Sequence, residues 1–295
     1  MGNIVDGKQI AEEIAESLKL KVSEIASYGH RPELAVVLVG ENPASLSYIK
    51  IKKKQAENTG IDLKIYRYPV DVSEADLISE IEKLNAKPLV CGIIVQLPLP
   101  AHMDRQKVLD AVQPELDIDC LATFNKQRLI EGKSGLDPYF VPPAARAVME
   151  IIRYHRITLP GRHILLIGAG DLIGKPLSAI FLKAGVAFEL ANRHTENLHE
   201  LSAKADIVIT GVGKENLVTG DMIKDGAVVI DAGTTGSEEG GITGDVDRAS
   251  VEPKASLLAP VPGGVGPLTI ALLMANTVQA ARQRRGAVSR VEAVH

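Results

Sequence analysis

A phenol and an amine lie four residues apart in the lysine-rich segment 43–54. If this segment is helical, Tyr48 and Lys52 share one face, because residues four apart on an α-helix are neighbours. A phenol beside an amine can exchange protons with a bound substrate when that face lines a cleft. The same segment carries three more lysines, which by themselves indicate a solvated helix face. The pair alone leaves both interpretations open.

Two further polar positions lie close to turns. Gln96 begins the sequence Gln-Leu-Pro-Leu-Pro, whose prolines stop a preceding apolar strand and hold an extended loop at its carboxyl end. Ligands bind at that end of the strands in open α/β sheets. Asp117 and Asp119 stand together after the next predicted helix. Gln96 could equally satisfy a loop carbonyl, and Asp117 could cap a turn.

A glycine-rich turn follows the predicted strand 163–167. Gly168, Gly170 and Gly174 permit a tight turn in which backbone N–H groups approach a phosphate at the start of the next helix. The spacing is one residue longer than the standard dinucleotide fingerprint. A turn of this kind can be purely structural, but its place in a strand–helix–strand unit favours nucleotide binding.

Residues near the end of the next predicted strand, 186–191, indicate which nucleotide is bound. An acid at this point would bind the ribose hydroxyls of NAD, but Glu189 falls before the strand ends. Arg193 stands about where a ribose 2′-phosphate would lie, and a guanidinium suits phosphate. The sequence therefore favours NADP and leaves NAD open, because Arg193 could also be an ordinary loop arginine.

Composition excludes several classes of protein. The 295 residues are 45% hydrophobic, enough for two domains, and the net charge of −4 argues against a nucleic-acid or membrane-surface partner. Two cysteines give neither a disulfide framework nor a zinc site, and the histidines lack metal-ligand spacing. We see no signal peptide and no apolar run long enough for a bilayer, so we expect a cytoplasmic protein without a metal.

Strand-like apolar runs alternate with helical patterns along the chain, which predicts an α/β fold with a mostly parallel sheet. Helices are predicted at 8–27, 44–58, 73–84, 104–112, 143–155, 173–184 and 268–282. Strands are predicted at 34–39, 63–68, 89–95, 163–167, 186–191, 206–210, 227–231 and 257–259. The polar region of about 120–140 is predicted to be a turn-rich domain boundary, and the tail from residue 284 to be frayed.

These motifs, in this order, resemble the bifunctional methylenetetrahydrofolate dehydrogenase/methenyltetrahydrofolate cyclohydrolase (FolD) family over nearly the whole chain. Four blocks carry the resemblance. They are Pro43-Ala-Ser-x-x-Tyr48-x-x-x-Lys52-x-Lys54 with Gly60-Ile61, Gly92-Ile-Ile-Val-Gln96-Leu-Pro-Leu-Pro100, Asp117-Ile-Asp119, and Pro260-Val-Pro-Gly-Gly-Val-Gly-Pro-Leu-Thr269 with Asn276-Thr277.

The resemblance implies two α/β domains flanking a cleft, the second of Rossmann type, usually in a homodimer. Residues 1–138 with 268–295 would form the folate-binding catalytic domain, and 139–267 the NAD(P)-binding domain. The implied reactions belong to one-carbon metabolism and purine biosynthesis. A hydride passes from 5,10-methylenetetrahydrofolate to NAD(P)+, and water converts the resulting 5,10-methenyltetrahydrofolate to 10-formyltetrahydrofolate.

The resemblance also assigns roles to residues. Lys52 would be the catalytic lysine, Gln96 would orient it, Tyr48 would line the pterin site, and Asp119 would bind the amino and ring N–H groups of the pterin. A free lysine has a pKa of about 10.4, so Lys52 must be desolvated to act near neutral pH. Further folate-binding positions are Leu97, Pro98, Pro262, Gly263 and Gly264. Cofactor-binding positions are Gly168, Ala169, Gly170, Asp171, Leu172, Ile173, Gly174, Arg193, Thr210, Gly211 and Thr234.

The chain departs from the family pattern at several positions. Cys120 replaces the usual glycine after Asp119, and Ala169 and Gly170 replace an arginine and a serine in the cofactor turn. That arginine commonly holds the NADP 2′-phosphate, and Arg193 could compensate for it. Two alternatives stay open: a cyclohydrolase without dehydrogenase activity, and a non-catalytic folate- or nucleotide-binding Rossmann protein. An unrelated shikimate-type or amino-acid dehydrogenase would share the two-domain plan but not the Gln96–Pro100 loop.

Overall fold

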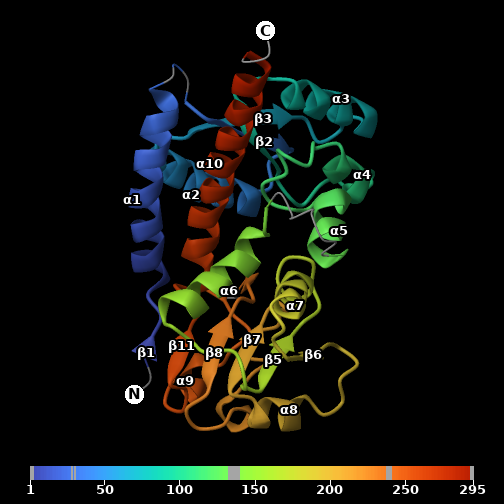
Figure 1. Ribbon diagram of the computed structural model, residues 1–295. Helices are drawn as coiled ribbons and strands as arrows, with labels where there is room; N and C mark the ends of the chain where they lie inside the picture. The colour runs from blue at the N-terminus through green and yellow to red at the C-terminus, as the bar shows by residue number, and fades with distance from the viewer. Residues whose placement is uncertain (1–2, 28, 30, 132–139, 237–240, 293–295) are drawn as a thin grey trace. The chain divides into compact units, whose positions relative to one another are not determined.

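The computed structural model describes residues 3–27, 29, 31–131, 140–236 and 241–292, and the chain divides into two compact units (Figure 1). We name the units by their sheets. The described residues of 12–128, 140 and 270–292 form the three-stranded unit, and those of 3–11, 129–131 and 141–269 form the six-stranded unit.

A wholly buried central strand organises the three-stranded unit. In the order β3-β2-β4, β2 (Glu33–Val39) pairs in parallel with β3 (Asp62–Tyr68) and β4 (Val90–Val95). All seven residues of β2 are buried, as expected for a parallel strand covered on both faces. The side chains of Leu34, Val36 and Leu38 enter one hydrophobic cluster, and those at 35, 37 and 39 enter another.

Different helices cover the two faces. Apolar residues of α1 (Gly7–Ala26), α2 (Pro43–Thr59) and α10 (Val265–Glu292) pack in the cluster of Leu34, Val36 and Leu38. Apolar residues of α3 (Glu74–Asn85) and α4 (Arg105–Asp110) pack in the other. Ser73 caps α3, because its hydroxyl accepts the Asp76 N–H. Within the described residues, no helix combines the length and apolarity needed to cross a membrane.

The six-stranded unit has a fully parallel sheet in the order β1-β11-β8-β7-β5-β6. Its strands are β1 (Asn3–Ile4), β5 (Ile164–Ile167), β6 (Glu189–Ala191), β7 (Ile207–Thr210), β8 (Val228–Asp231) and β11 (Leu257–Ala259). Its further elements are α6 (Pro143–Tyr154), α7 (Gly174–Lys183), α8 (Leu198–Lys204), η1 (Gly220–Met222), α9 (Arg248–Val251) and the antiparallel pair β9 (Thr235–Gly236) and β10 (Ile242–Thr243). The strand–helix–strand order confirms a Rossmann-type unit and the predicted α/β class.

Three details differ from the sequence-based expectations. Residues 3–11 belong to the six-stranded unit because β1 pairs with β11, whereas they were predicted in the other domain; a two-residue strand gives no periodic signal. A helix, α5 (Thr123–Glu131), lies inside the region predicted to be turn-rich. The last helix continues to Glu292 rather than ending at 282, consistent with its many arginine, glutamine and alanine residues, which are good helix formers.

Candidate active site

One of the four lysines of helix α2 (Pro43–Thr59) differs from the others in its burial. Ser45, Ile49 and Ala56 are buried at helical spacing, and Lys52 falls on the same stripe and is partly buried. The other lysines of the helix, at positions 50, 53 and 54, are exposed. The structure therefore assigns the solvated-face interpretation to three lysines and excludes it for Lys52.

Gln96 holds the Lys52 side chain from the end of β4. The Lys52 Nζ donates to Gln96 Oε1 at 3.0 Å, and Gln96 is only 9% exposed. The orientation of the amide is fixed because its Nε2 donates to the Leu97 carbonyl at 3.0 Å, which leaves Oε1 to accept. The Ser45 hydroxyl donates to the same carbonyl at 3.1 Å. The first turn of α2 and the loop after β4 are thereby joined beside Lys52.

Asp119 supplies the opposite charge. Burial lowers the pKa of Lys52, and the negative charge of Asp119 acts in the other direction. Burial likewise raises the pKa of Asp119, and the positive charge of Lys52 opposes the shift. Each group is thus moved towards its neutral form by burial and towards its charged form by the other. Such a pair can take up or release a proton nearer neutral pH than isolated side chains would.

The segment that presents Asp119 is fixed by buried polar groups. The Asp117 carboxylate accepts the N–H groups of Leu121 and Ala122 at 3.1 and 2.9 Å, so Asp117 is the turn cap that the sequence left as one possibility. Burial raises the pKa of Asp117 to about 6, although these hydrogen bonds act to lower it. From α10, the fully buried Asn276 donates through Nδ2 to the Ile118 carbonyl at 2.8 Å.

Cys120, which follows Asp119, has an unusual backbone conformation. Its φ is 58°, in the left-handed region where a side chain costs roughly 1 kcal/mol or more and glycine does not. The thiol side chain is nevertheless buried, with 1% exposure. The conformation explains physically why glycine suits this position.

The other predicted folate-site residues vary in their placement. Tyr48 lies one turn before Lys52 and is 42% exposed. Leu97 is half-buried and Pro98 is exposed, both directly after Gln96. Pro262, Gly263 and Gly264 belong to the six-stranded unit, where the Gly263 carbonyl accepts the Gly7 N–H at 2.9 Å. The structure thus brings together Lys52, Gln96 and Asp119, with Tyr48 on the same helix.

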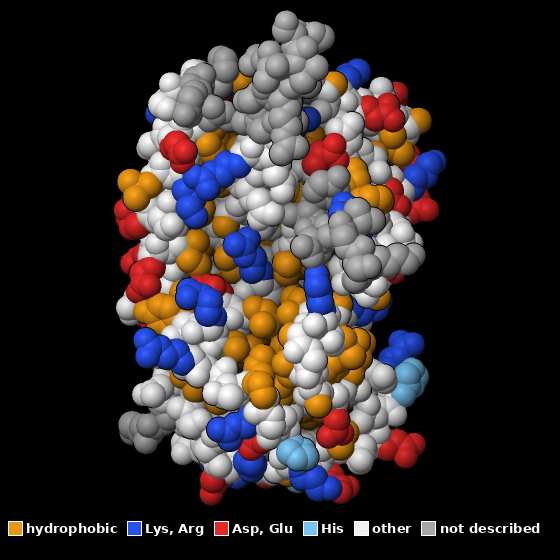
Figure 2. All heavy atoms as spheres, in the orientation of Figure 1, with side chains coloured by type: hydrophobic (Ala, Val, Ile, Leu, Met, Phe, Trp, Pro, Cys, Tyr) orange, Lys and Arg blue, Asp and Glu red, His pale blue; other side chains and the backbone are white. Residues whose placement is uncertain are grey.

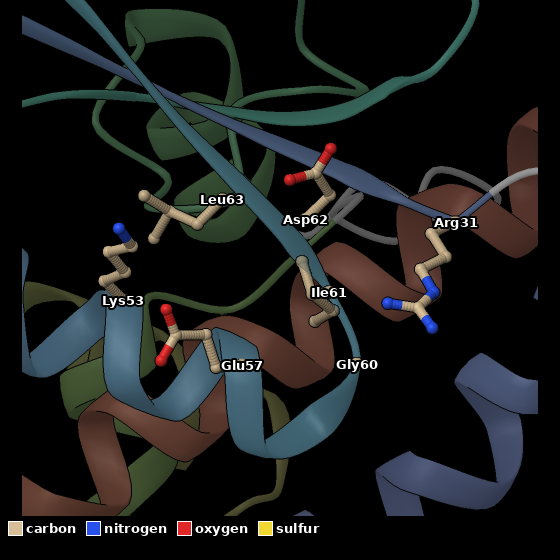
Figure 3. A pocket seen from close by; sticks show the side chains of 7 residues that line it. All are labelled: Arg31, Lys53, Glu57, Gly60, Ile61, Asp62 and Leu63. Carbon is tan, nitrogen blue, oxygen red and sulfur yellow. The ribbon is translucent and has the colours of Figure 1, made fainter.

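A separate pocket lies beside the C-terminal half of α2 (Figure 3). Figure 3 shows Lys53 and Glu57 on α2 and Asp62 at the start of β3. Its lining residues are Arg31, Lys53, Glu57, Gly60, Ile61, Asp62 and Leu63. Their two positive and two negative charges balance, and Lys52 is not among them. This pocket therefore does not belong to the Lys52 site.

The glycine-rich turn after β5 has no room for side chains at two of its glycines. A Cβ on Gly174 would lie 1.8 Å from the Gly168 carbonyl oxygen, and Gly168 itself has a φ of 103°. Gly170 is exposed, and a Cβ there would meet only the Gly211 carbonyl oxygen, at 4.0 Å. The turn therefore leads tightly into the N-terminus of α7 and leaves open space beside Gly170, which fits a dinucleotide phosphate.

The remaining predicted cofactor residues are in diverse environments. Asp171 and Lys175 form an ion pair at 2.7 Å at the start of α7. Arg193 is exposed and donates through Nε to His194 Nε2 at 3.1 Å. Thr234 is exposed after β8, whereas Thr210 is fully buried and donates to Asp245 at 2.6 Å. The Thr210 hydroxyl is therefore used inside the protein and is not available to a cofactor.

Sequence reasoning missed several residues that shape these sites. Ser45 could have been found from its place in the first turn of α2, and Asp245 from its Gly-Asp-Val-Asp context, but neither pattern indicates a partner. The Asn276-Thr277 motif likewise indicates no partner for Asn276. No group of three or more His, Cys, Asp or Glu side chains is placed to hold a metal ion in the part of the chain described here.

Comparison with known proteins gives two family matches. The tetrahydrofolate dehydrogenase/cyclohydrolase catalytic domain matches residues 5–119, and the NAD(P)-binding domain of the same name matches residues 142–285. The bifunctional protein FolD of Nautilia profundicola is 43% identical over 279 residues, covering 95% of this chain and 97% of that protein.

Solved structures agree with these matches. The bifunctional FolD enzyme of Campylobacter jejuni has a TM-score of 0.91 at 38% identity, over 96% of this chain and 100% of that one. The Trypanosoma brucei methylenetetrahydrofolate dehydrogenase-cyclohydrolase, solved with NADP cofactor and an inhibitor, has a TM-score of 0.89 at 31% identity, over 96% of this chain and 98% of that one.

Proposed function

The chain belongs to the tetrahydrofolate dehydrogenase/cyclohydrolase family, and on that premise we propose that Lys52, Gln96 and Asp119 form its catalytic centre. The protein is a bifunctional enzyme. It oxidises 5,10-methylenetetrahydrofolate to 5,10-methenyltetrahydrofolate with NAD(P)+, and it hydrolyses the product to 10-formyltetrahydrofolate.

Lys52 is the general base of the hydrolytic step. Water must lose a proton as it attacks the methenyl carbon, and a neutral amine beside that water can accept it. The observation that carries this role is the Lys52 Nζ–Gln96 Oε1 hydrogen bond of 3.0 Å on the buried stripe of α2. Burial lowers the pKa of Lys52, which increases the neutral fraction near physiological pH.

Asp119 and Tyr48 bind the pterin. A carboxylate accepts two parallel hydrogen bonds, which matches the amino and ring N–H groups of a pterin. The hydrogen bonds of Asp117 and Asn276 to the same segment support this role, because they hold the backbone that carries Asp119. Tyr48 lies one helical turn from Lys52 and offers an aromatic wall with a polar tip.

The nicotinamide cofactor, when bound, accepts the hydride in the dehydrogenase step. The turn from Gly168 to Gly174 holds the phosphates through the N-terminus of α7. We assign NADP as the preferred cofactor, with NAD as the alternative. The exposed Arg193 supports this choice because its guanidinium can pair with a 2′-phosphate.

The protein works in the cytoplasm as a homodimer. In the six-stranded unit, β6 is an edge strand, and Leu190 on it and Leu182 on α7 are 40% and 71% exposed. Figure 2 shows hydrophobic side chains gathered over the region of α7, β5 and β7. Light scattering after gel filtration is expected to give twice the mass of the chain, and L182E/L190K is expected to give a monomer. A monomeric wild-type protein would contradict the assignment.

One pair of assays tests the proposed chemistry. Methenyltetrahydrofolate formation is followed with NADP+ and with NAD+, and its hydrolysis is followed separately. We expect reduction with at least one nucleotide, and loss of hydrolysis in Lys52→Gln with the fold intact. Hydrolysis without reduction of either nucleotide would identify a cyclohydrolase alone. Normal hydrolysis by Lys52→Gln would remove the role assigned to Lys52.

A further inference from the structure

A buried carboxylate in the six-stranded unit accepts hydrogen bonds from the loop that follows β7. Asp245 is fully buried, and one of its oxygens, Oδ2, accepts the Thr210 hydroxyl at 2.6 Å and the Val212 N–H at 2.7 Å. The other, Oδ1, accepts the N–H groups of Gly213 and Lys214, both at 2.8 Å. Three consecutive backbone donors therefore point inward to one side chain.

A second buried carboxylate holds Asp245 in place. Asp231, at the end of β8, accepts the backbone N–H of Asp245 at 3.1 Å and that of Val246 at 3.0 Å. Two glycines make room for the pair. A Cβ on Gly233 would lie 2.1 Å from the Asp245 carboxylate carbon, and a Cβ on Gly244 would lie 2.0 Å from an Asp231 oxygen. The arrangement tolerates no side chain at either glycine.

The loop that is bound by Asp245 packs against the glycine-rich turn 168–174. A Cβ on Gly168 would lie 2.8 Å from the Gly211 carbonyl oxygen, and a Cβ on Gly211 would lie 2.9 Å from the Ile173 side chain. Because the N–H groups at 212–214 are turned inward, the loop presents outward the side chains of Val212 and Lys214, which are exposed. Its inward hydrogen bonds thus fix one wall beside Gly168 and Gly170.

We propose that Asp245 is a positioning residue for the nicotinamide cofactor, acting through the loop 211–214 that it holds against the glycine-rich turn. This inference rests on the proposed dehydrogenase function. Since the N–H groups of Val212, Gly213 and Lys214 donate to Asp245, they would not hold a cofactor phosphate as a nest.

The test uses Asp245→Asn in the full-length enzyme. The amide keeps the size but replaces one acceptor with a donor that faces backbone N–H groups. We expect the KM for NADP+ to rise about 10- to 100-fold, as the loss of one or two hydrogen bonds would give. We expect cyclohydrolase turnover to stay at the wild-type level, because Lys52, Gln96 and Asp119 belong to the other unit.

Asp247→Asn is the matched control. It makes the same chemical change two residues away, at the cap of α9, where its side chain accepts the Ala249 N–H and the Ser250 hydroxyl. Its KM should remain that of the wild type. An unchanged KM in Asp245→Asn would overturn the inference while leaving the proposed function intact. Absence of NAD(P)+ reduction by the wild-type enzyme would instead refute the proposed dehydrogenase.

If Asp245→Asn does not fold, a second pair of variants tests the positioning role of Asp245. Thr210→Val removes one of the four donors to Asp245, and Thr210→Ser retains it. A KM for NADP+ that is higher in Thr210→Val than in Thr210→Ser supports the inference. Equal KM values in both variants would overturn it.

Discussion

The hydrogen bond between Lys52 and Gln96 predicts opposite pH responses in two variants of Gln96. Gln96→Leu keeps the approximate size and removes the acceptor 3.0 Å from the Lys52 Nζ. Gln96→Glu keeps the shape and places a carboxylate there. If neutral Lys52 is the base of the hydrolytic step, the acid limb of the rate–pH profile follows its pKa.

The magnitudes follow from the distance. A hydrogen bond to a charged group contributes about 1.5–3 kcal/mol, and one pKa unit corresponds to about 1.4 kcal/mol. Gln96→Leu should therefore move the acid limb about 1–2 units down. For Gln96→Glu, two charges about 3 Å apart attract by roughly 5 kcal/mol before the cost of desolvating the new carboxylate. A net rise of about 1–3 units is expected, as for other close ion pairs.

The assay is the loss of methenyltetrahydrofolate absorbance, measured from acid to alkaline pH with the non-enzymatic rate subtracted. Gln113→Leu and Gln113→Glu are matched controls, because Gln113 is an exposed glutamine of the same unit. Their profiles should coincide with that of the wild type. Shifts in the same direction in both Gln96 variants, or no shift in either, would refute the assignment of Lys52 as the titrating base.

Three further predictions concern the segment that carries Asp119. Asn276→Ala should lower the free energy of unfolding by about 1–3 kcal/mol, because the Ile118 carbonyl loses its buried donor; an unchanged urea midpoint would contradict this. The pKa of Asp117, about 6, lies above its unfolded value, so its protonated form stabilises the fold below pH ~4 and this contribution is lost as pH rises through ~6. Relative to Asp117→Asn, the wild type should lose up to about 3 kcal/mol between pH 4 and 7 in urea titrations, and parallel curves would count against it. Cys120→Val should destabilise the protein by at least about 1 kcal/mol more than Cys120→Gly, because a β-branched residue resists a φ of 58°; equal stabilities would exclude backbone strain there.

The fold could be predicted because each of its main elements carries a local pattern. Residues 34–39 of the buried strand are a continuous apolar run, and the cap at Ser73 is fixed by residues three apart. By contrast, α5 was missed because its burial depends on Asn125, whose amide donates to Asp117 and to the Pro114 carbonyl. A polar side chain that is buried through distant partners resembles a loop residue in the sequence.

For the same reason, only part of the candidate site could be predicted from the sequence. The type and spacing of Tyr48 and Lys52 suggested proton chemistry, but Lys52 differs from Lys53 only in the side of α2 on which it lies. Asp245 and Asn276 act on backbone groups 31–33 and 158 residues away. No short motif records such a partner, because a backbone N–H or carbonyl is available at almost every position.

The alternation of side chains along β2 has a consequence for engineering this enzyme. The face of Leu34, Val36 and Leu38 shares its packing with α2, which carries Lys52, and with α10, which carries Asn276. The face of 35, 37 and 39 packs with α3 and α4. Core substitutions on the first face therefore act on the helices that carry Lys52 and Asn276, whereas those on the second face act on α3, on α4 and on Val95, Leu116 and Leu121, which flank Gln96 and Asp119.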